Sequence, residues 1–360
     1  MSFRRAVVFG GAGFIGSNLS KSLLDDGHHV IVFDSLARRG SELNLAWLQQ
    51  LHSADRLEFR QSDIRDFAAV EAAVRNADEI YHLAAQVAVT TSVENPRTDF
   101  EVNALGTLNV LEAARLGGRH PPIVFTSTNK VYGGLEDLTT VETKTRYEFR
   151  DLPLGVSESQ SMDFHSPYGC SKGAADQYVR DYHRIYGLPT VVFRMSCIYG
   201  PRQFGNEDQG WVAHFIIASL TDQPVTIYGN GKQVRDLLFV DDLVRALRLA
   251  ATKIYMTAGQ VFNIGGGPAN SLSVWHEFGR RLAALKGKNI PVRFEHWRPG
   301  DQLCYVSDIL KAERVMGWCP EVDKDTGIRR LWEWVSSNPQ LFRKPAAQVA
   351  GCAVERAASA

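Results

Sequence analysis

Apolar residues occur along this chain in short continuous runs, separated by glycine-rich turns and by longer segments with helical spacing. The opening is an example: AVVF (6–9) is followed by a helix-like stretch (17–27) and then by HVIVFD (29–34). Continuous runs of β-branched residues are typical of parallel strands buried on both faces. Further strand-like runs, with helix-length segments such as 98–118 among them, lie at residues 57–63, 79–85, 122–128, 189–196 and 260–266.

This alternation of strand and helix predicts the fold class. Parallel strands joined by helices form right-handed βαβ crossovers, and a series of them builds an α/β fold with a doubly wound parallel sheet of the Rossmann type. After about residue 196 the pattern gives way to loops rich in Gly, Gln, Asn and Trp, which indicates a smaller second lobe. We therefore expect a Rossmann domain at 1–195 and 235–265, a C-terminal substrate-binding lobe at 196–234 and 266–342, and a tail at 343–360.

Composition narrows the possible partners. Among 360 residues, 40 basic side chains balance 40 acidic ones, so no net field favours nucleic acid or a membrane surface, and a small-molecule partner is expected. No apolar run reaches the roughly 18 residues that span a bilayer. The apolar stretch at the start of the sequence is too short for a signal peptide, so we expect a cytoplasmic protein. The five cysteines show no metal-binding spacing, so we expect reduced thiols and no metal site.

Glycines follow the first predicted strand at intervals that suit a dinucleotide. The turn must be tight, the backbone must approach a pyrophosphate, and the helix must pack closely on the strand with its N-terminus facing the phosphates. A glycine motif alone is weak evidence, but here the strand and helix occupy the required places. The cofactor-binding residues predicted from this loop are Gly10, Gly13, Phe14, Ile15 and Gly16.

Acidic residues end the second and third predicted strands. Asp34 could accept a hydrogen bond from the adenine-side ribose and would repel a 2′-phosphate, which favours NAD over NADP, although Arg38 and Arg39 weaken this preference. Asp63 and Ile64 would lie beside the adenine if the strand order is that of a Rossmann sheet. A plain strand-end carboxylate is the alternative interpretation of Asp63.

Tyr168 and Lys172 are four residues apart, so they share one face of a helix. A phenol with a pKa of about 10 is a poor base, but a nearby ammonium and an oxidised nicotinamide favour the phenolate. Tyr168 could then take a hydroxyl proton while the carbinol hydride leaves. The Y-x-x-x-K pair is common on solvated helices, yet together with the glycine loop and the hydroxyl-rich strand end at 126–128 it indicates redox catalysis.

These motifs resemble the extended short-chain dehydrogenase/reductases, which include the sugar-nucleotide epimerases and dehydratases. The resemblance covers roughly residues 4–335, and it includes HLAA at 82–85, GNGKQVRD at 229–236 and RPGD at 298–301. It implies NAD as cofactor and a nucleotide sugar as substrate. The implied roles are cofactor contact for Leu83, Ala84, Ala85 and Asn103, a bond to the reacting sugar oxygen for Thr128, and binding of the diphosphate and ribose for Arg235, Arg298 and Asp301.

The two residues that directly follow Thr128 distinguish between two types of reaction. Dehydratases of this superfamily carry an Asp-Glu pair there, because elimination needs one group to protonate the departing hydroxyl and another to take a carbon-bound proton. Here the pair is Asn129 and Lys130. An amide performs no acid–base work, and an ammonium could act as a base only if burial lowered its pKa by several units. Elimination is therefore disfavoured.

Four longer blocks, at 126–133, 161–178, 202–215 and 229–236, resemble the CDP-paratose 2-epimerase (CDP-tyvelose epimerase) family. That resemblance implies transient NAD-dependent oxidation at C2 of a CDP-linked 3,6-dideoxyhexose, a step of lipopolysaccharide O-antigen biosynthesis. A ketone at C4 would acidify only the hydrogens at C3 and C5, so no 4-keto route inverts C2. Candidate residues of the sugar and base pocket are Gln86, Asn129, Lys130, Asp163, His165, Arg202, Gln203, Asp208, Gln209 and Trp211.

Two other functions remain open on sequence alone. One is a sugar-nucleotide epimerase or reductase acting at C4. The other is a non-catalytic NAD-binding regulator, although such proteins typically lack the tyrosine or the lysine. Cys197 departs from relatives, which often place asparagine there and use it for the diphosphate. Helices near 100–115 and 166–187 form a dimer bundle in related enzymes, so we expect a homodimer or homotetramer.

Overall fold

A seven-stranded parallel sheet forms the centre of the computed structural model, which describes residues 4–298 and 300–342; the predicted tail (343–360) lies outside the described residues. Its strands are β1 (Arg5–Phe9), β2 (His29–Asp34), β3 (Leu57–Gln61), β4 (Glu79–His82), β5 (Ile123–Thr128), β8 (Thr190–Met195) and β12 (Val261–Ile264). Their order is β12-β8-β5-β4-β1-β2-β3, so the doubly wound prediction is confirmed. The order reverses between β1 and β4, and ligands of such sheets bind at the carboxyl ends of the strands beside this point.

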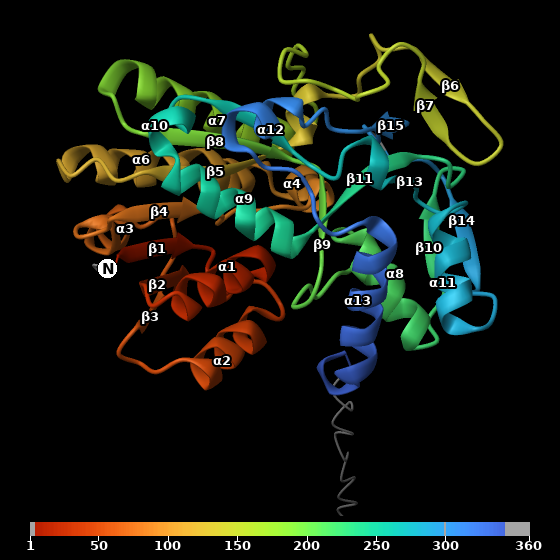
Figure 1. Ribbon diagram of the computed structural model, residues 1–360, viewed down its shortest axis with the longest axis horizontal. Coiled ribbons are helices and arrows are strands. Elements are labelled where there is room, and N and C mark those ends of the chain that lie inside the picture. The colour runs from red at the N-terminus through yellow and green to blue at the C-terminus, as the bar shows by residue number, and fades with distance from the viewer. Residues whose placement is uncertain (1–3, 299, 343–360) are drawn as a thin grey trace, which may run out of the picture.

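Helices cover both faces of this sheet (Figure 1). Side chains alternate along each strand, so Val8 packs into one core and Val7 into the other. No helix of the described ranges is both long enough and apolar enough to cross a membrane. One face carries α1 (Phe14–Asp25), α2 (Ser41–Leu51) and α9 (Val240–Thr252), and the other carries α3 (Phe67–Val74), α6 (Gly106–Leu116) and α7 (Ser166–Tyr186).

The segment predicted as one helix at 98–118 is divided. It follows α4 (Val89–Glu94) and consists of α5 (Pro96–Phe100), a π-helical turn η1 (Glu101–Leu105) and then α6. A π-turn inside a helix often marks a functional position. This one carries Asn103, for which the family resemblance implies contact with the cofactor.

A smaller lobe lies beside the carboxyl ends of the sheet strands, on the right in Figure 1. Its central strand β11 pairs in parallel with β9 and β15 and antiparallel with β13, while β10 pairs with β14. The strands are β9 (Cys197–Tyr199), β10 (Val225–Tyr228), β11 (Val234–Phe239), β13 (Ser271–Ser273), β14 (Val292–Glu295) and β15 (Cys304–Tyr305). The helices are α8 (Trp211–Leu220), α11 (Phe278–Lys286) and α13 (Lys324–Ser337), and α10 (Ile254–Thr257) and α12 (Leu310–Met316) lie nearer to β12.

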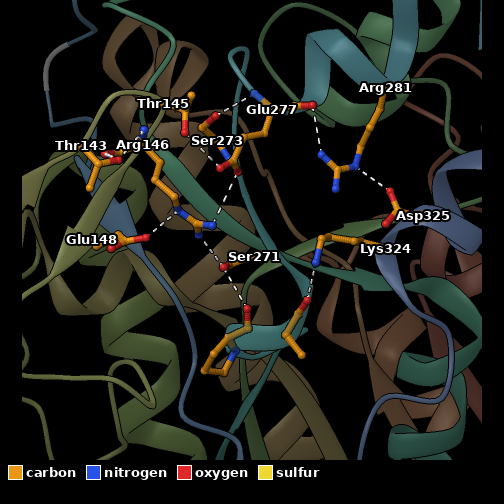
Figure 2. Close-up of polar contacts among 12 residues, drawn as sticks. Thr143, Thr145, Arg146, Glu148, Ser271, Ser273, Glu277, Arg281, Lys324 and Asp325 are labelled. Atoms are coloured by element: carbon orange, nitrogen blue, oxygen red, sulfur yellow. Dashed lines mark hydrogen bonds and ion pairs between the residues drawn. The ribbon is translucent and has the colours of Figure 1, made fainter. Parts of the chain in front are cut away.

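A hairpin of β6 (Thr140–Glu142) and β7 (Tyr147–Phe149) is tied to this lobe by Arg146 (Figure 2). The guanidinium donates to Ser271 Oγ at 2.6 Å and lies 3.3 Å from Glu148 and 3.6 Å from Glu277. Because Glu277 also accepts a hydrogen bond from the β13 backbone, one arginine links the hairpin to two elements of the lobe.

A buried histidine stands at the carboxyl end of β4. His82 Nε2 lies 2.9 Å from Thr107 Oγ1, whose own hydrogen is donated to Asn103 O at 2.6 Å. Nε2 must therefore carry a proton and donate it, while Nδ1 has no partner. Burial, with the nearby Lys172 ammonium, lowers the pKa of His82 to about 3.

This histidine should make stability depend on pH. Its folded pKa lies below the unfolded value of about 6.5, so its contribution is fully present above that pH and is lost as the pH falls toward the folded pKa. His82→Gln keeps a donor for Thr107 but does not titrate. Between about pH 7 and about pH 5 the wild type should lose about 2 kcal/mol more unfolding free energy than the variant. Denaturant unfolding at each pH measures this difference, and parallel curves would contradict it.

Candidate active site

The predicted glycine loop joins β1 to α1 and lies against the loop that follows β4. Gly10 has φ +76°, and a Cβ there would stand 2.8 Å from Ala84 N. A Cβ on Gly16 would stand 2.0 Å from Gly10 O, so the first helical turn can approach the strand only without a side chain. A Cβ on Gly13 would meet only Gly10 O, at 3.2 Å, and Phe14 begins α1 directly after it. The half-buried start of this helix suits a pyrophosphate.

Asp34 stands at the end of β2 next to that loop. Its carboxylate accepts hydrogen bonds from Ala12 N at 3.1 Å and Leu36 N at 2.9 Å, and burial raises its pKa. Its position at the strand end is the one from which the sequence predicts contact with an adenine-side ribose. Arg38, which the sequence left ambiguous, interacts electrostatically with Tyr168, and burial lowers the pKa of its guanidinium. Its charge therefore faces the catalytic side of the sheet.

The residues predicted beside the adenine and nicotinamide lie along the neighbouring strand ends. Asp63 is paired with Arg65, at 2.7 Å, and this contact lowers its pKa. Ile64 is buried, and its carbonyl accepts from Asn109 at 3.0 Å. Leu83, Ala84 and Ala85 form the loop after β4, in which Leu83 N donates to Phe9 O at 2.9 Å.

Three predicted catalytic groups meet at the carboxyl end of β5. Thr128 ends the strand, and its hydrogen bond with the Tyr168 phenol partly offsets the burial that raises the pKa of Tyr168 to about 12. The Lys172 ammonium donates to Thr126 O at 2.7 Å and lies 4.2 Å from the centre of the Phe125 ring. Burial lowers the pKa of Lys172 to about 7. A buried phenol and a buried amine on one helical face can exchange a proton with an alcohol held beside them.

Asn103 connects the catalytic helix to the sheet. Its side chain exchanges hydrogen bonds with the backbone of Gln86, at 2.9 and 3.1 Å, and donates to Asp99 at 3.1 Å and Ser171 at 3.0 Å. Ser171 in turn donates to Asp99. Sequence reasoning missed Asp99 and Ser171. The available signals were that Ser171 precedes Lys172 and that Asp99 lies four residues before Asn103 on a helical segment.

A charged cluster lies on the substrate side of Thr128. Asp301 accepts from Arg235 at 2.6 Å and stands 3.9 Å from the Lys130 ammonium. Burial and the charge of Arg235 lower the pKa of Lys130 to about 8. Asn129 donates to Gln302 Oε1 at 3.1 Å, which fixes its amide. Four predicted substrate residues therefore come together here from η2 (Asn129–Tyr132), which follows β5, from β11 and from the segment before β15.

Other predicted pocket residues form the rim of the smaller lobe. The Arg298 guanidinium lies 3.9 Å from the centre of the Tyr228 ring and donates to Glu207 O at 3.1 Å. The side-chain carbonyl oxygens of Gln203 and Gln209 are buried without a partner. Unsatisfied buried acceptors are uncommon, and a bound ligand can supply the missing donors.

The remaining pocket candidates differ in exposure: Asp163 and His165 are exposed, and Gln86 and Trp211 are half-buried. Gln86 keeps a buried, unpartnered carbonyl oxygen near Asn103, and Trp211 donates to Cys197 Sγ at 3.4 Å. Asp208 lies 3.6 Å from Arg298, whereas Asp163 and His165 form an exposed pair, 2.9 Å apart, before α7. Glu136 joins that pair to give three metal-type side chains with ligand atoms within 4.8 Å of one another, but all three are exposed.

Arg202, predicted for the sugar pocket, packs on two tryptophans. Its guanidinium stands 4.1 Å from the centre of the Trp47 ring and 5.7 Å from that of Trp334. It lines a separate cavity of about 930 Å³ between α1 and α9. The physical cause is local: the backbone turns at Arg202 with φ +71°, and a planar guanidinium stacks well on indole faces.

Known proteins resemble this chain in sequence and fold over most of its length. Residues 7–331 match the GDP-mannose 4,6-dehydratase family model. The chain is 46% identical to CDP-paratose 2-epimerase from Salmonella typhi, over 92% of this chain and 99% of that protein. It is 34% identical to UDP-glucose 4-epimerase from Mycolicibacterium smegmatis, over 93% and 100% of the two chains. A double mutant of dTDP-glucose 4,6-dehydratase from Streptomyces venezuelae, solved with NAD bound, superposes with a TM-score of 0.80 at 32% identity, covering 93% and 98% of the two chains.

Proposed function

Because this chain belongs to the GDP-mannose 4,6-dehydratase family, a group of NAD-dependent enzymes, we propose that it is an NAD-dependent sugar-nucleotide epimerase that acts at C2. Its substrate is a CDP-linked 3,6-dideoxyhexose, and the reaction interconverts CDP-paratose and CDP-tyvelose. The observation that carries this proposal is the 46% identity with CDP-paratose 2-epimerase across nearly the whole of both chains. The Asn129–Lys130 pair supports it independently, because elimination chemistry would need acids there.

Residues of the large sheet hold the cofactor. Gly10 and Gly16 let the loop and the first turn of α1 pack closely on the strand, Gly13 precedes that turn, and a pyrophosphate would bind at the start of the helix. Asp34 would accept a hydrogen bond from the adenine-side ribose. Asn103 fixes the loop that faces the nicotinamide through its bonds to Gln86. When bound, NAD supplies the acceptor and then the donor for the hydrogen of C2.

The side chains of the chain itself move the hydroxyl proton. Thr128 orients the C2 hydroxyl toward Tyr168, whose pKa burial raises to about 12 in the protein without cofactor. The positive charge of a bound oxidised nicotinamide would lower this pKa, so that the phenolate could take the hydroxyl proton as the carbon is oxidised. The Lys172 ammonium, held at 2.7 Å from Thr126 O, lowers the cost of the phenolate charge. If the 2-ketone rotated in the pocket and were reduced on its other face, Tyr168 would return the proton to the oxygen.

The second candidate is epimerisation at C4, supported by the 34% identity with UDP-glucose 4-epimerase. Thr128, Tyr168 and Lys172 would serve either carbon, since each reaction oxidises and reduces one alcohol. The choice therefore depends on which hydroxyl the substrate pocket presents to them. The higher identity with the 2-epimerase favours C2.

Removing one oxygen atom should test the base. Tyr168→Phe should lower kcat by about 10²- to 10⁴-fold with little change in folding or NAD content, since only the proton acceptor is lost. Tyr178→Phe, on the same helix but half exposed, is the matched control and should keep full activity. Lys172→Ala should raise the pKa of Tyr168, and because the base must be deprotonated, the rising limb of the pH–rate profile should move to higher pH. Retention of more than about a tenth of the rate in Tyr168→Phe would exclude this base.

The route through C2 has an isotopic consequence. A hydrogen that leaves C2 with its electron pair and returns to the same carbon never mixes with solvent protons. Incubation with CDP-paratose in D₂O should therefore give CDP-tyvelose without deuterium at C2, as read by NMR. Deuterium at C2 would indicate deprotonation of carbon and overturn the mechanism, while turnover of UDP-sugars at C4 in place of CDP-paratose would establish the second candidate.

A second copy of this chain would cover one apolar face. Phe100, Leu116, Tyr178 and Ile185, from α5, α6 and α7, leave between 50% and 65% of their surface exposed. Paired helices of two subunits would bury these side chains in a four-helix bundle, the arrangement predicted from the sequence. The assembly is accordingly a homodimer, or a tetramer built from such dimers.

Charge placed on this face should separate the subunits. Ile185→Asp should give a monomer in light scattering coupled to gel filtration, because a carboxylate would lose its hydration inside the bundle. Tyr255→Asp, at a more exposed site outside these helices, should leave the wild-type mass unchanged. An unchanged mass for Ile185→Asp would rule out this face.

A further inference from the structure

Lys130 lies between the catalytic end of β5 and the diphosphate-binding residues. Its backbone N–H donates to Thr128 Oγ1 at 3.2 Å, so its position is fixed relative to the catalytic hydroxyl. Its ammonium reaches the other way, to 3.9 Å from Asp301, which is bound to Arg235. With 26% of the side chain accessible, Lys130 is a half-buried cation that faces the substrate side.

The charges around Lys130 do not balance. Arg235 and Lys130 contribute two positive charges, and Asp301 contributes one negative charge. The other group that faces Lys130 is the Cys197 thiol, whose pKa burial raises, so it remains neutral. Positive charge that is partly removed from water without a partner is unfavourable, and this cost is expressed as the lowered pKa of Lys130. An anion in this place would complete the cluster.

The proposed substrate carries such an anion next to the reacting carbon. C2 of the sugar is bonded to C1, and C1 carries the oxygen of the sugar-proximal phosphate. C4 lies across the ring from C1. A pocket that presents C2 to Thr128 and Tyr168 must therefore bring this phosphate close to the catalytic residues, whereas a pocket that presents C4 holds it farther away.

We infer that Lys130 determines the position of reaction: its ammonium binds the sugar-proximal phosphate beside Thr128, so that C2 and not C4 faces the catalytic residues. This inference rests on the proposed function, and it gives a reason for a cation at the place where dehydratases of the superfamily carry an acid. Arg235, with its planar fork, binds the same diphosphate from the other side. Bound to a phosphate, Lys130 stays protonated and does not act as a carbon base.

Proton uptake on ligand binding provides a direct test. Free Lys130 has a pKa of about 8, and a bound phosphate raises it. At about pH 8.5 the NAD-loaded protein should therefore take up on the order of half a proton or more per CDP bound, because free Lys130 is then mostly neutral. Calorimetry in two buffers of different ionisation enthalpy measures this uptake. CMP, which lacks the sugar-proximal phosphate, should cause no uptake.

Variants assign the uptake to Lys130. Lys130→Met should abolish it and weaken CDP binding by about ten-fold to a hundred-fold, with CMP binding unchanged. Lys130→Arg should keep most of the affinity but take up no proton, since guanidinium is charged throughout. Lys130→Gln serves if the methionine variant folds poorly, as judged by its NAD content. Equal proton uptake by wild type and Lys130→Met, or equal loss of CMP and CDP affinity, would overturn the inference.

The same experiments distinguish a failure of the proposed function from a failure of the Lys130 inference. If UDP and UMP bind in place of CDP and CMP, the base is uracil and the proposed substrate is wrong, yet the difference between diphosphate and monophosphate still tests Lys130. With the correct nucleotide sugar, Lys130→Met should also raise KM more than it lowers kcat. The opposite split would assign Lys130 a role in the chemical step and contradict phosphate binding.

Discussion

The hydrogen bond from the Lys172 ammonium to the Thr126 carbonyl is the contact on which the site depends. It joins α7 to the central strand β5 in a region where both groups are buried, so neither can exchange its partner for water at low cost. Tyr168, one helical turn earlier, is thereby held against Thr128. The Asn103 cluster secures the same helix from its other side. The acid–base groups are therefore positioned by the sheet itself, before any substrate enters.

Local patterns predicted those parts of the molecule that short segments determine. Buried β-branched runs gave the seven parallel strands, and glycine spacing gave the loop in which Gly16 approaches Gly10. The four-residue interval placed Tyr168 and Lys172 on one face. In each case the spacing of residues along the chain determines the local geometry.

Features that depend on distant contacts were not predictable in this way. Ser171 and Asp99 are 72 positions apart, and only the docking of α5 on α7 brings them together. Arg202 follows a family-like motif, but a left-handed turn directs it to two indoles. The π-turn at η1 has no spacing signal, because one extra residue in a helix leaves the surrounding apolar pattern almost unchanged.

Arg202 contacts both Trp47 and Trp334 and so joins the two lobes beside a cavity whose lining includes none of the catalytic residues. Trp47 belongs to α2 beside the large sheet, and Trp334 belongs to α13 of the smaller lobe. The contact thus ties α2 to α13, so any relative rotation of the two lobes either keeps this contact as its fixed point or breaks it.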